Sequence, residues 1–318
     1  MRRALVLSGG GAKGGFQVGA LRYIMEREAK GMPPSSYFEI ISGTSVGALN
    51  GVMMAQNRYD ALRGLWDHLS GGHIYRGSLG ILPVFSRFMM RRPGLLSNAP
   101  LWETIKKNIS LDAVDGDCDF IFGALSVDTG AYHSFRASDF TDERQFLQGI
   151  LASSSMPVIW PPVKSITTGT GAIYRQLVDG GVRNKRPMGE VIGCHPDEVV
   201  IINCNADDFH PYPDPAKGML RTAIRVLTEI TINEIFRQDI REFLHINQIV
   251  GQLPAGVTVK KSDGTLFKKY RSILIEPSHD LGDALDFSRS KINLHMEKGY
   301  EAAALAYERS RATENLLE

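Results

Sequence analysis

Gly43-Thr44-Ser45-Val46-Gly47 follows the short apolar run Glu39–Ser42 and precedes Ala48–Ala55, a stretch that can continue as a helix. A serine with a glycine two residues before it and another two residues after it, between a strand and a helix, is typical of a nucleophile elbow. Small residues flank the serine because the sharp turn leaves no room for larger side chains. A serine N-cap of an ordinary helix is the alternative, but it explains the serine without explaining both glycines.

A second glycine-rich stretch, Gly9–Gly15 (GGGAKGG), stands between the apolar run Ala4–Ser8 and a helical pattern that begins at Phe16. Backbone N–H groups at such a strand-to-helix turn bind anions. The stretch also satisfies the dinucleotide pattern G-x-G-x-x-G, although the next strand does not end in the acidic residue that would hold a ribose. A Walker A loop is excluded, because no Ser or Thr follows the lysine. Taken alone, the stretch leaves a dinucleotide site, an oxyanion site and a plain turn open.

The two glycine motifs are more informative together. In a right-handed β-α-β unit the two strands lie near each other, and their carboxyl-end loops open at the same edge of the sheet. The N–H groups of the first loop can therefore face Ser45. This arrangement favours an oxyanion hole over a dinucleotide site.

The order of apolar and amphipathic segments predicts the fold class. The runs Val199–Cys204 and Ser272–Glu276 are as short and strand-like as the first two, and amphipathic stretches separate them. Such alternation is typical of a mainly parallel sheet covered by helices, so we expect an α/β fold in a single domain over residues 1–318. Asp119–Arg136 and Val257–Glu276 each contain a central turn and predict antiparallel hairpins at the margin of the sheet.

The composition excludes several classes of protein. The share of hydrophobic residues is 43% and that of charged residues 22%, as in ordinary globular domains. The net charge of +1 gives no general attraction for nucleic acid, and we expect no nucleic-acid partner. The three cysteines, Cys118, Cys194 and Cys204, lack zinc-site spacing and indicate a reducing compartment. Neither a cleaved signal peptide nor a membrane span is evident, so we expect a cytoplasmic or peripheral membrane protein.

A serine nucleophile needs a group that accepts its proton, usually a histidine oriented by a carboxylate. None of the eight histidines stands in a convincing motif, and His279, after Glu276-Pro277, is kept as the rival base. Asp179-Gly180-Gly181 stands out instead, because the carboxylate follows the strand-like run Tyr174–Val178 and the glycines permit a close approach of backbone. From the residues alone, an ordinary turn with an Asx-type hydrogen bond remains the simpler explanation of Asp179.

Four blocks follow one another along the chain: GGGAKG from Gly9, GTSVGAL from Gly43, ASSSMPVIWPPV over Ala152–Val163, and DGG over Asp179–Gly181. In this order they resemble the blocks of the patatin-like phospholipase family, and the similarity spans about Leu5 to Val182. The resemblance implies a three-layer α/β/α fold of the patatin or lysophospholipase type. It also implies an enzyme that hydrolyses acyl esters of phospholipids or related lipids.

Carried over by position, the resemblance implies a Ser-Asp dyad without histidine, in which Ser45 is the nucleophile and Asp179 the base. The implied reaction passes through an acyl-enzyme and needs no metal and no organic cofactor. Lys13 stands where the family often has arginine, and this departure does not touch the dyad. The other residues implied at the site belong to the oxyanion loop and to the elbow: Gly10, Gly11, Lys13, Gly14, Gly43 and Gly47.

Two segments are candidates for contact with lipid. Gly77–Trp102 mixes many apolar residues with Arg87, Arg91 and Arg92, and predicts either a lid that meets a membrane surface or a part of the core. The basic hairpin Val257–Glu276 could meet anionic headgroups, although charged hairpins are usually solvated edges. We therefore expect a lipid or membrane-surface substrate and a peripheral contact with membranes. The sequence indicates no oligomeric state.

Three alternative functions remain open. A dinucleotide-binding protein would use the GGGAKG loop, but it leaves GTSVG and DGG unexplained. A histidine-dependent α/β-hydrolase esterase would explain Ser45, yet such enzymes usually place the elbow after several strands rather than near the start of the chain. A non-catalytic lipid-binding protein would keep the pocket without turnover.

Overall fold

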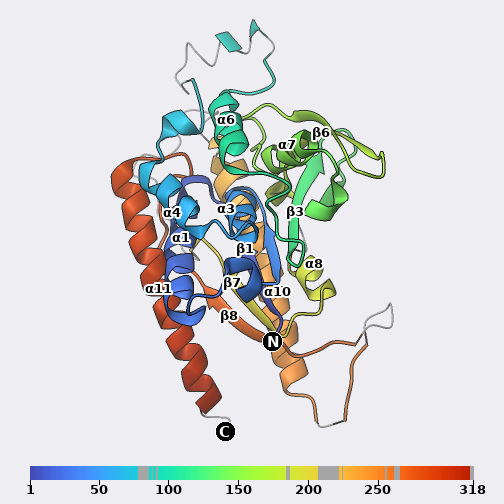
Figure 1. Ribbon diagram of the computed structural model, residues 1–318, viewed down its shortest axis with the longest axis vertical. Helices are drawn as coiled ribbons and strands as arrows, with labels where there is room; N and C mark the ends of the chain where they lie inside the picture. The colour runs from blue at the N-terminus through green and yellow to red at the C-terminus, as the bar shows by residue number, and fades with distance from the viewer. Residues whose placement is uncertain are drawn as a thin grey trace.

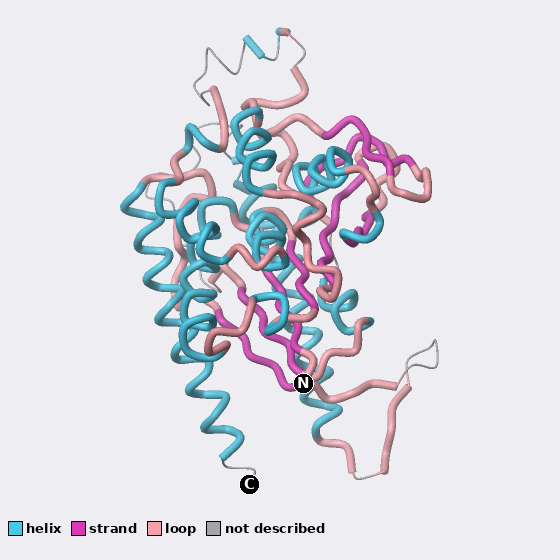
Figure 2. The backbone as a smooth tube through the Cα atoms, viewed as in Figure 1, coloured by secondary structure: helices cyan, strands magenta, loops and turns pink. Residues whose placement is uncertain are grey.

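The computed structural model describes residues 1–77, 86–87, 89–90, 92–183, 187–206, 222–223, 225–254, 256–260 and 266–315, arranged around one mixed sheet (Figures 1 and 2). Within this part of the chain eight strands form the sheet in the order β5-β6-β3-β2-β1-β7-β8, and β4 pairs with β3 outside this path. The strands are β1 Arg3–Leu7, β2 Ile40–Gly43, β3 Asp119–Ser126, β4 Tyr132–Arg136, β5 Val163–Thr167, β6 Ile173–Asp179, β7 Glu198–Ile202 and β8 Arg271–Ile275.

The expected α/β fold is confirmed. The four predicted apolar runs form β1, β2, β7 and β8, which are parallel to their neighbours in the sheet. β3 and β4 form the expected antiparallel hairpin, but the predicted position at the margin is wrong for β3. β3 pairs in parallel with β2 and antiparallel with β6, so it lies in the interior of the sheet. Its nearly continuous burial is typical of a strand covered on both faces.

Helices cover both faces of the sheet and give three layers, α/β/α (Figure 1). One layer contains α1, α3, α7 and α11, with α4 and α6 packed at its outer side, and α8 and α10 lie against the other face. The helices are α1 Gly14–Tyr23, α2 Pro34–Tyr37, α3 Val46–Ala55, α4 Tyr59–His68, α6 Ala99–Asn108, α7 Glu143–Ser153, α8 Pro187–Gly193, α10 Ile232–Gly251 and α11 Arg289–Asn315.

Alternation of side chains along β1 divides the core in two. Leu5 and Leu7 join the large apolar core under α1, α3 and α11, whereas Ala4 and Val6 join the smaller core under α8 and α10. Because both faces are buried, the strand is a continuous apolar run in the sequence. Its carboxyl end delivers the glycine-rich loop to the edge of the sheet where β2 also ends.

Two segments singled out in the sequence are described only in part. In Gly77–Trp102, residues 78–85, 88 and 91 lie outside the described residues. Met89 and Met90 are 65% and 64% exposed, whereas Leu96 is buried and its N–H donates to Ile159 O. In the basic segment Val257–Glu276, residues 261–265 lie outside the described residues, Lys260 and Leu266 form an isolated antiparallel bridge, and β8 belongs to the main sheet.

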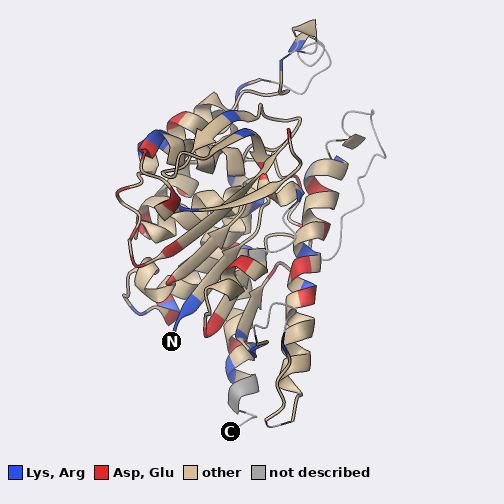
Figure 3. Ribbon diagram, turned by 90° about the vertical axis from the view of Figure 1, so that its right-hand side faces the viewer, with Lys and Arg blue, Asp and Glu red and all other residues tan. Residues whose placement is uncertain are grey.

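The charged residues are mixed in sign. Figure 3 shows acidic and basic residues interspersed along the helices and strands, in keeping with the net charge of +1. Among the described residues, no helix combines the length and the apolar character needed to cross a bilayer.

The contact between α1 and α11 depends on two glycines. A Cβ atom on Gly19 would lie 1.8 Å from Met296 O, and one on Gly299 would lie 1.9 Å from Phe16 O. The two backbones therefore approach more closely than any side chain permits. This contact fixes α11 against the helix that follows the glycine-rich loop.

Gly19→Ala should therefore lower the free energy of unfolding, by about 1–3 kcal/mol as for other overpacked cores. Gly64 offers a matched control in another helix, because a Cβ atom there would meet nothing within 4 Å. Gly64→Ala should leave stability unchanged or raise it by about 0.5–1 kcal/mol through its effect on helix propensity. Urea unfolding of the two variants checks both values, and equal effects would contradict the close helix contact.

Candidate active site

Ser45 lies in a strained turn between β2 and α3. Its backbone has φ 57° and ψ −126°, which non-glycine residues rarely adopt, and its side chain is only 6% exposed. The first turn of α3 begins at once, since Gly47 N–H donates to Thr44 O and Ala48 N–H donates to Ser45 O. The turn thus places the Ser45 hydroxyl at the N-terminus of α3, where the helix dipole favours negative charge.

Gly43 and Gly47 make this turn sterically possible. A Cβ atom on Gly43 would lie 2.1 Å from Gly47 O, and one on Gly47 would lie 2.4 Å from Leu7 O at the end of β1. The elbow is therefore packed directly on the neighbouring strand. Neither position can hold a larger residue without a shift of the backbone.

Asp179 ends β6 and is buried, with 1% of its surface exposed. Its Oδ1 accepts a hydrogen bond from Gly181 N–H at 2.9 Å, whereas Oδ2 is buried without a hydrogen-bond partner among the described residues. Burial raises the pKa of Asp179 to about 6, and the Ser45 hydroxyl and the Gly181 N–H, which favour the carboxylate, oppose this rise only in part. Asp179 thus has a buried, unpaired acceptor oxygen and lines the same cavity as Ser45.

A serine-rich segment connects these two residues. Ser45 N–H donates to Ser153 O at 3.1 Å, and Asp179 N–H donates to Ser155 O at 2.9 Å. The segment leaves the end of α7 and passes between the elbow and β6, so its backbone sets the distance between the hydroxyl and the carboxylate. This contact gives a physical role to the ASSSMP block, for which the sequence suggested no mechanism.

The glycine-rich loop lies against the elbow. A Cβ atom on Gly9 would lie 3.2 Å from Ser45 Cβ. Gly9, Gly10 and Lys13 line a small cavity together with Ser45 and Asp179, called the polar cavity below for the charged and amide side chains in its lining. Within the described residues, the N–H groups of Gly10 and Gly11 meet no acceptor. The loop therefore offers free donors close to the serine.

Two residues of the predicted oxyanion loop have other partners. The Lys13 ammonium is buried and donates to Asp280 Oδ1 at 3.0 Å and to Asn205 Oδ1 at 3.4 Å. Gly14 N–H donates back to Gly11 O and Ala12 O, and a Cβ atom on Gly14 would collide with Val46. Gly14 thus packs α1 against α3 and lines neither of the two cavities that contain Ser45.

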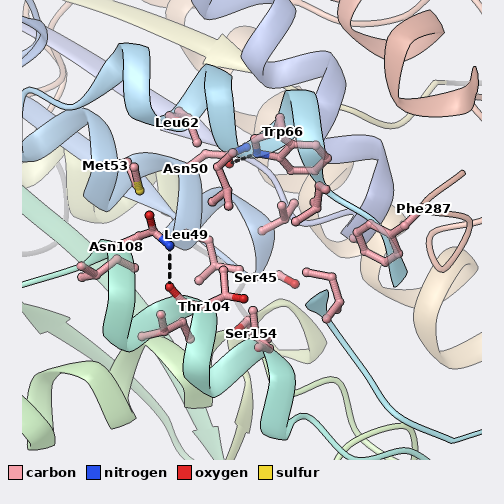
Figure 4. Close-up of a pocket in the computed structure, with 18 of the residues that line it drawn as sticks. Ser45, Leu49, Asn50, Met53, Leu62, Trp66, Thr104, Asn108, Ser154 and Phe287 are labelled. Carbon is pink, nitrogen blue, oxygen red and sulfur yellow. Dashed lines mark hydrogen bonds between the residues drawn. The ribbon is translucent and has the colours of Figure 1, made fainter. Parts of the chain in front are cut away.

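Ser45 also lines a larger, apolar cavity, whose side chains are drawn in Figure 4. Its empty space, the open mouth included, is about 720 Å³. Most lining residues are apolar and come from α3, α4 and α6, among them Leu49, Met53, Leu62, Trp66, Leu101 and Ile105. Ser45 stands at the junction of this cavity and the polar one.

Buried hydrogen bonds hold the wall of the apolar cavity in place. Trp66 Nε1 donates to Asn50 Oδ1 at 2.9 Å, and Asn50 Nδ2 donates to Gln17 Oε1 at 2.8 Å. Gln17 Nε2 in turn donates to Ser8 O at 2.7 Å. This series of hydrogen bonds joins α4, α3 and α1 to the end of β1. None of its residues was predicted from the sequence as part of the cavity wall.

No described histidine lines either cavity that contains Ser45. His279 is exposed on a loop. His295 is buried near the glycine-rich loop, but its ring nitrogens face the backbone oxygens of Ala12 and Leu281 at 3.2 and 2.9 Å. Among the described residues, moreover, no cluster of His, Cys, Asp and Glu side chains is suited to a metal ion.

The fold and the turn at Ser45 define an α/β protein with a serine in a strained strand-to-helix turn. The sequence model of the family described as patatin-like phospholipase matches residues 5–192, more than half of the chain, and the chain belongs to this family. The resemblance of the four sequence blocks to this family is thereby confirmed.

The chain is similar to three bacterial proteins. It is 27% identical over 210 residues to the cGAMP-activated phospholipase of Vibrio cholerae, a match that covers 61% of this chain and 57% of the relative. VipD from Legionella pneumophila has a TM-score of 0.42 at 11% identity, with 97% of this chain and 67% of that chain covered. ExoU in its complex with SpcU from Pseudomonas aeruginosa has a TM-score of 0.39 at 14% identity, with 97% and 52% covered.

The raised pKa of Asp179 predicts how stability depends on pH. A carboxyl group whose pKa is higher in the folded than in the unfolded state loses stabilising free energy as pH rises from about 3.9 through about 6. Asp179→Asn removes this dependence. Relative to the parent protein, the variant should therefore gain about 1.4 kcal/mol in free energy of unfolding between pH 5 and pH 8. Urea titrations at the two pH values measure it, and a difference that stays constant would contradict the buried carboxyl.

Proposed function

We propose that the protein is a lipid acyl hydrolase of the phospholipase A or lysophospholipase type that acts through a Ser45-Asp179 dyad. The observation that carries this proposal is the position of Ser45, between an apolar cavity and a polar one that also contains a buried carboxylate. An acyl chain fits the first cavity, and the reacting ester fits the junction. Family membership supports the same chemistry.

The reaction follows from the groups at this junction. Asp179 accepts the proton of the Ser45 hydroxyl as Oγ attacks the ester carbonyl, and the oxyanion is stabilised by the N–H groups of Gly10 and Gly11. Collapse expels the alcohol, which takes the proton from Asp179 and leaves an acyl group on Oγ. Water then gives a proton to Asp179 and attacks this acyl group, and the proton returns to Ser45 as the fatty acid leaves.

The environment of Asp179 supports its role as base. An ordinary aspartate is a weak base, but a pKa raised to about 6 brings the carboxylate closer to the pH at which it must accept a proton. Oδ2 has no competing hydrogen bond among the described residues. The group is thus ionised at neutral pH and still more basic than a solvated aspartate.

The alternatives have less support. A dinucleotide would have to approach the glycine-rich loop where Ala12 N–H donates to Ala284 O and a Cβ atom on Gly11 would meet that same oxygen. A histidine-dependent esterase needs an imidazole at Ser45, and the described histidines line neither cavity there. A lipid-binding protein without turnover would not need the strained backbone of Ser45.

The end of the molecule beyond α6 has features suited to contact with a lipid surface. The segment with Met89 and Met90 projects beyond α6 at the top of Figure 1, and both side chains are exposed. Arg87 and Arg92 lie beside them in the sequence and supply positive charge for phosphate groups. We therefore also propose that this end of the protein contacts the membrane surface that contains the substrate.

The dyad makes a direct prediction for activity. Ser45→Ala and Asp179→Asn should each lower ester turnover by orders of magnitude, because the first removes the nucleophile and the second keeps the shape of the base but cannot accept a proton. Hydrolysis of phospholipids, lysophospholipids, acylglycerols and p-nitrophenyl esters measures turnover, and a fluorophosphonate probe reports on Ser45.

His279→Ala is the matched control and should retain activity and labelling near those of the parent protein. Near-normal turnover in a folded Asp179→Asn protein, or loss of turnover in His279→Ala, would reject the dyad. The melting transition of each variant shows whether the fold is intact.

The apolar cavity predicts a dependence on chain length. Leu49 lies beside Ser45 on the wall of the cavity (Figure 4). Leu49→Trp should lower kcat/KM for long-chain p-nitrophenyl esters at least about tenfold, through steric exclusion worth about 1.4 kcal/mol, and should spare the acetyl ester. Kinetics across chain lengths measure the ratio, and an equal loss for short and long esters would argue against this cavity as the acyl site.

A further inference from the structure

The peptide unit between Gly9 and Gly10 is held by side chains from another strand. Gly9 O accepts a hydrogen bond from Cys204 Sγ at 3.1 Å and another from Asn205 Nδ2 at 3.1 Å. Both donors follow β7, which pairs with β1 on the side opposite β2. Cys204 is fully buried and Asn205 is 8% exposed, so water competes little for these bonds.

The loop needs such support because of its composition. Three consecutive glycines have no side chains that favour one orientation of their peptide units. An oxyanion hole works only when its donors already point at the site, since reorientation during the reaction would cost part of the stabilisation. The orientation must therefore be imposed by contacts outside the loop.

Bonds to the oxygen of this peptide also orient its N–H group. The described peptide bonds are all trans, and in a trans peptide the C=O and N–H groups point in opposite directions. With Gly9 O turned toward Asn205, the Gly10 N–H points away from it. Gly9 lies against Ser45, and Gly10 lines the cavity that contains Ser45 and Asp179.

We infer that Asn205, assisted by Cys204, is a positioning residue that turns the Gly10 N–H toward the oxyanion formed at Ser45. The inference rests on the proposed acyl transfer to Ser45. Asn205 lines the same cavity as Ser45 and Asp179, but its side-chain amide is bound to Gly9 O and Lys13, so it acts on the oxyanion through the Gly9–Gly10 peptide.

The amide of Asn205 is itself oriented by its neighbours. Lys13 Nζ faces Asn205 Oδ1 at 3.4 Å, and an ammonium group only donates, so the atom that faces it must be the amide oxygen. The amide nitrogen is thereby directed to Gly9 O. Asn203 fixes the backbone of Asn205 from both sides, since its Oδ1 accepts from Asn205 N–H and its Nδ2 donates to Asn205 O.

Lys13 has a defined role in this arrangement. Its ammonium is shared between Asn205 and Asp280, both of which lie far from it in the sequence. Asp280 Oδ1 also accepts from Gly282 N–H, and Ala284 O in the same loop accepts from Ala12 N–H. The lysine thus joins the glycine-rich loop to both neighbouring segments.

Asn205→Asp tests the inference with little change of shape. The aspartate keeps an acceptor for Lys13 but replaces the donor that faces Gly9 O by a second acceptor, which repels that oxygen. kcat for a p-nitrophenyl ester should fall about tenfold or more, with a change in KM below about threefold, against the roughly 100- to 1000-fold loss for a deleted oxyanion donor.

A tetrahedral inhibitor separates positioning from stability. The affinity for an alkyl trifluoromethyl ketone, whose adduct with Ser45 carries an oxyanion, should fall by the same factor as kcat/KM. Cys204→Ala should show a smaller loss in both measurements, and Cys204→Ser, which keeps a donor for Gly9 O, should restore them. Asn247→Asp is the matched control, because among the described residues the Asn247 amide binds only the backbone of Tyr270. This variant should affect the melting temperature without affecting kcat.

The outcomes are distinguishable. Parental kcat and inhibitor affinity in Asn205→Asp would overturn the inference, and so would a loss that merely follows the folded fraction of the variant. Turnover that survives in Ser45→Ala would overturn the proposed function instead. Loss of turnover in Ser45→Ala together with unchanged rates in Asn205→Asp would leave the dyad intact and reject the positioning role alone.

Discussion

The contact between Gly47 and the last carbonyl of β1 is the constraint on which the site depends. A Cβ atom at Gly47 would lie 2.4 Å from Leu7 O, so the first turn of α3 rests on the backbone of the adjacent strand. This contact holds the elbow serine next to the loop that leaves β1. Because β1 and β2 are parallel and paired, the two loops share one edge of the sheet. The other residues of the site pack around the turn at Ser45 and the glycine-rich loop after β1.

The site contains a strained backbone at Ser45 and a buried carboxyl group at Asp179, both of which are unfavourable in an ordinary protein core. Ser45 has an unfavourable backbone conformation, and Asp179 is buried with one carboxylate oxygen unpaired among the described residues. The Ser153–Ser155 backbone accepts hydrogen bonds from the N–H groups of both residues. The close contact of α11 with α1 stabilises the helix that follows the glycine-rich loop. The rigid surroundings therefore maintain a geometry that neither residue would adopt alone.

The two cavities at Ser45 are built from different parts of the fold. The wall of the apolar cavity comes from helices of one layer, whereas the polar cavity is lined by strand-end loops and by the start of α10. Ser45 belongs to both, because the elbow lies where the helical layer meets the edge of the sheet. An ester bond placed at this point would have its acyl chain in apolar surroundings and its carbonyl oxygen near free N–H groups.

Features that depend only on neighbouring residues could be predicted from the amino-acid sequence. Steric limits encode the local backbone conformation at Gly43 and Gly47 around Ser45 and at the glycines that follow β1. The apolar runs predict the parallel strands in the same local way. Three other features became known only from the three-dimensional structure: β3 lies inside the sheet, the Gly14 N–H is bonded within its own turn, and Lys13 pairs with Asp280, a residue 267 positions away. Such pairings depend on how distant segments pack, and the pattern of residues around either partner contains no information about the other.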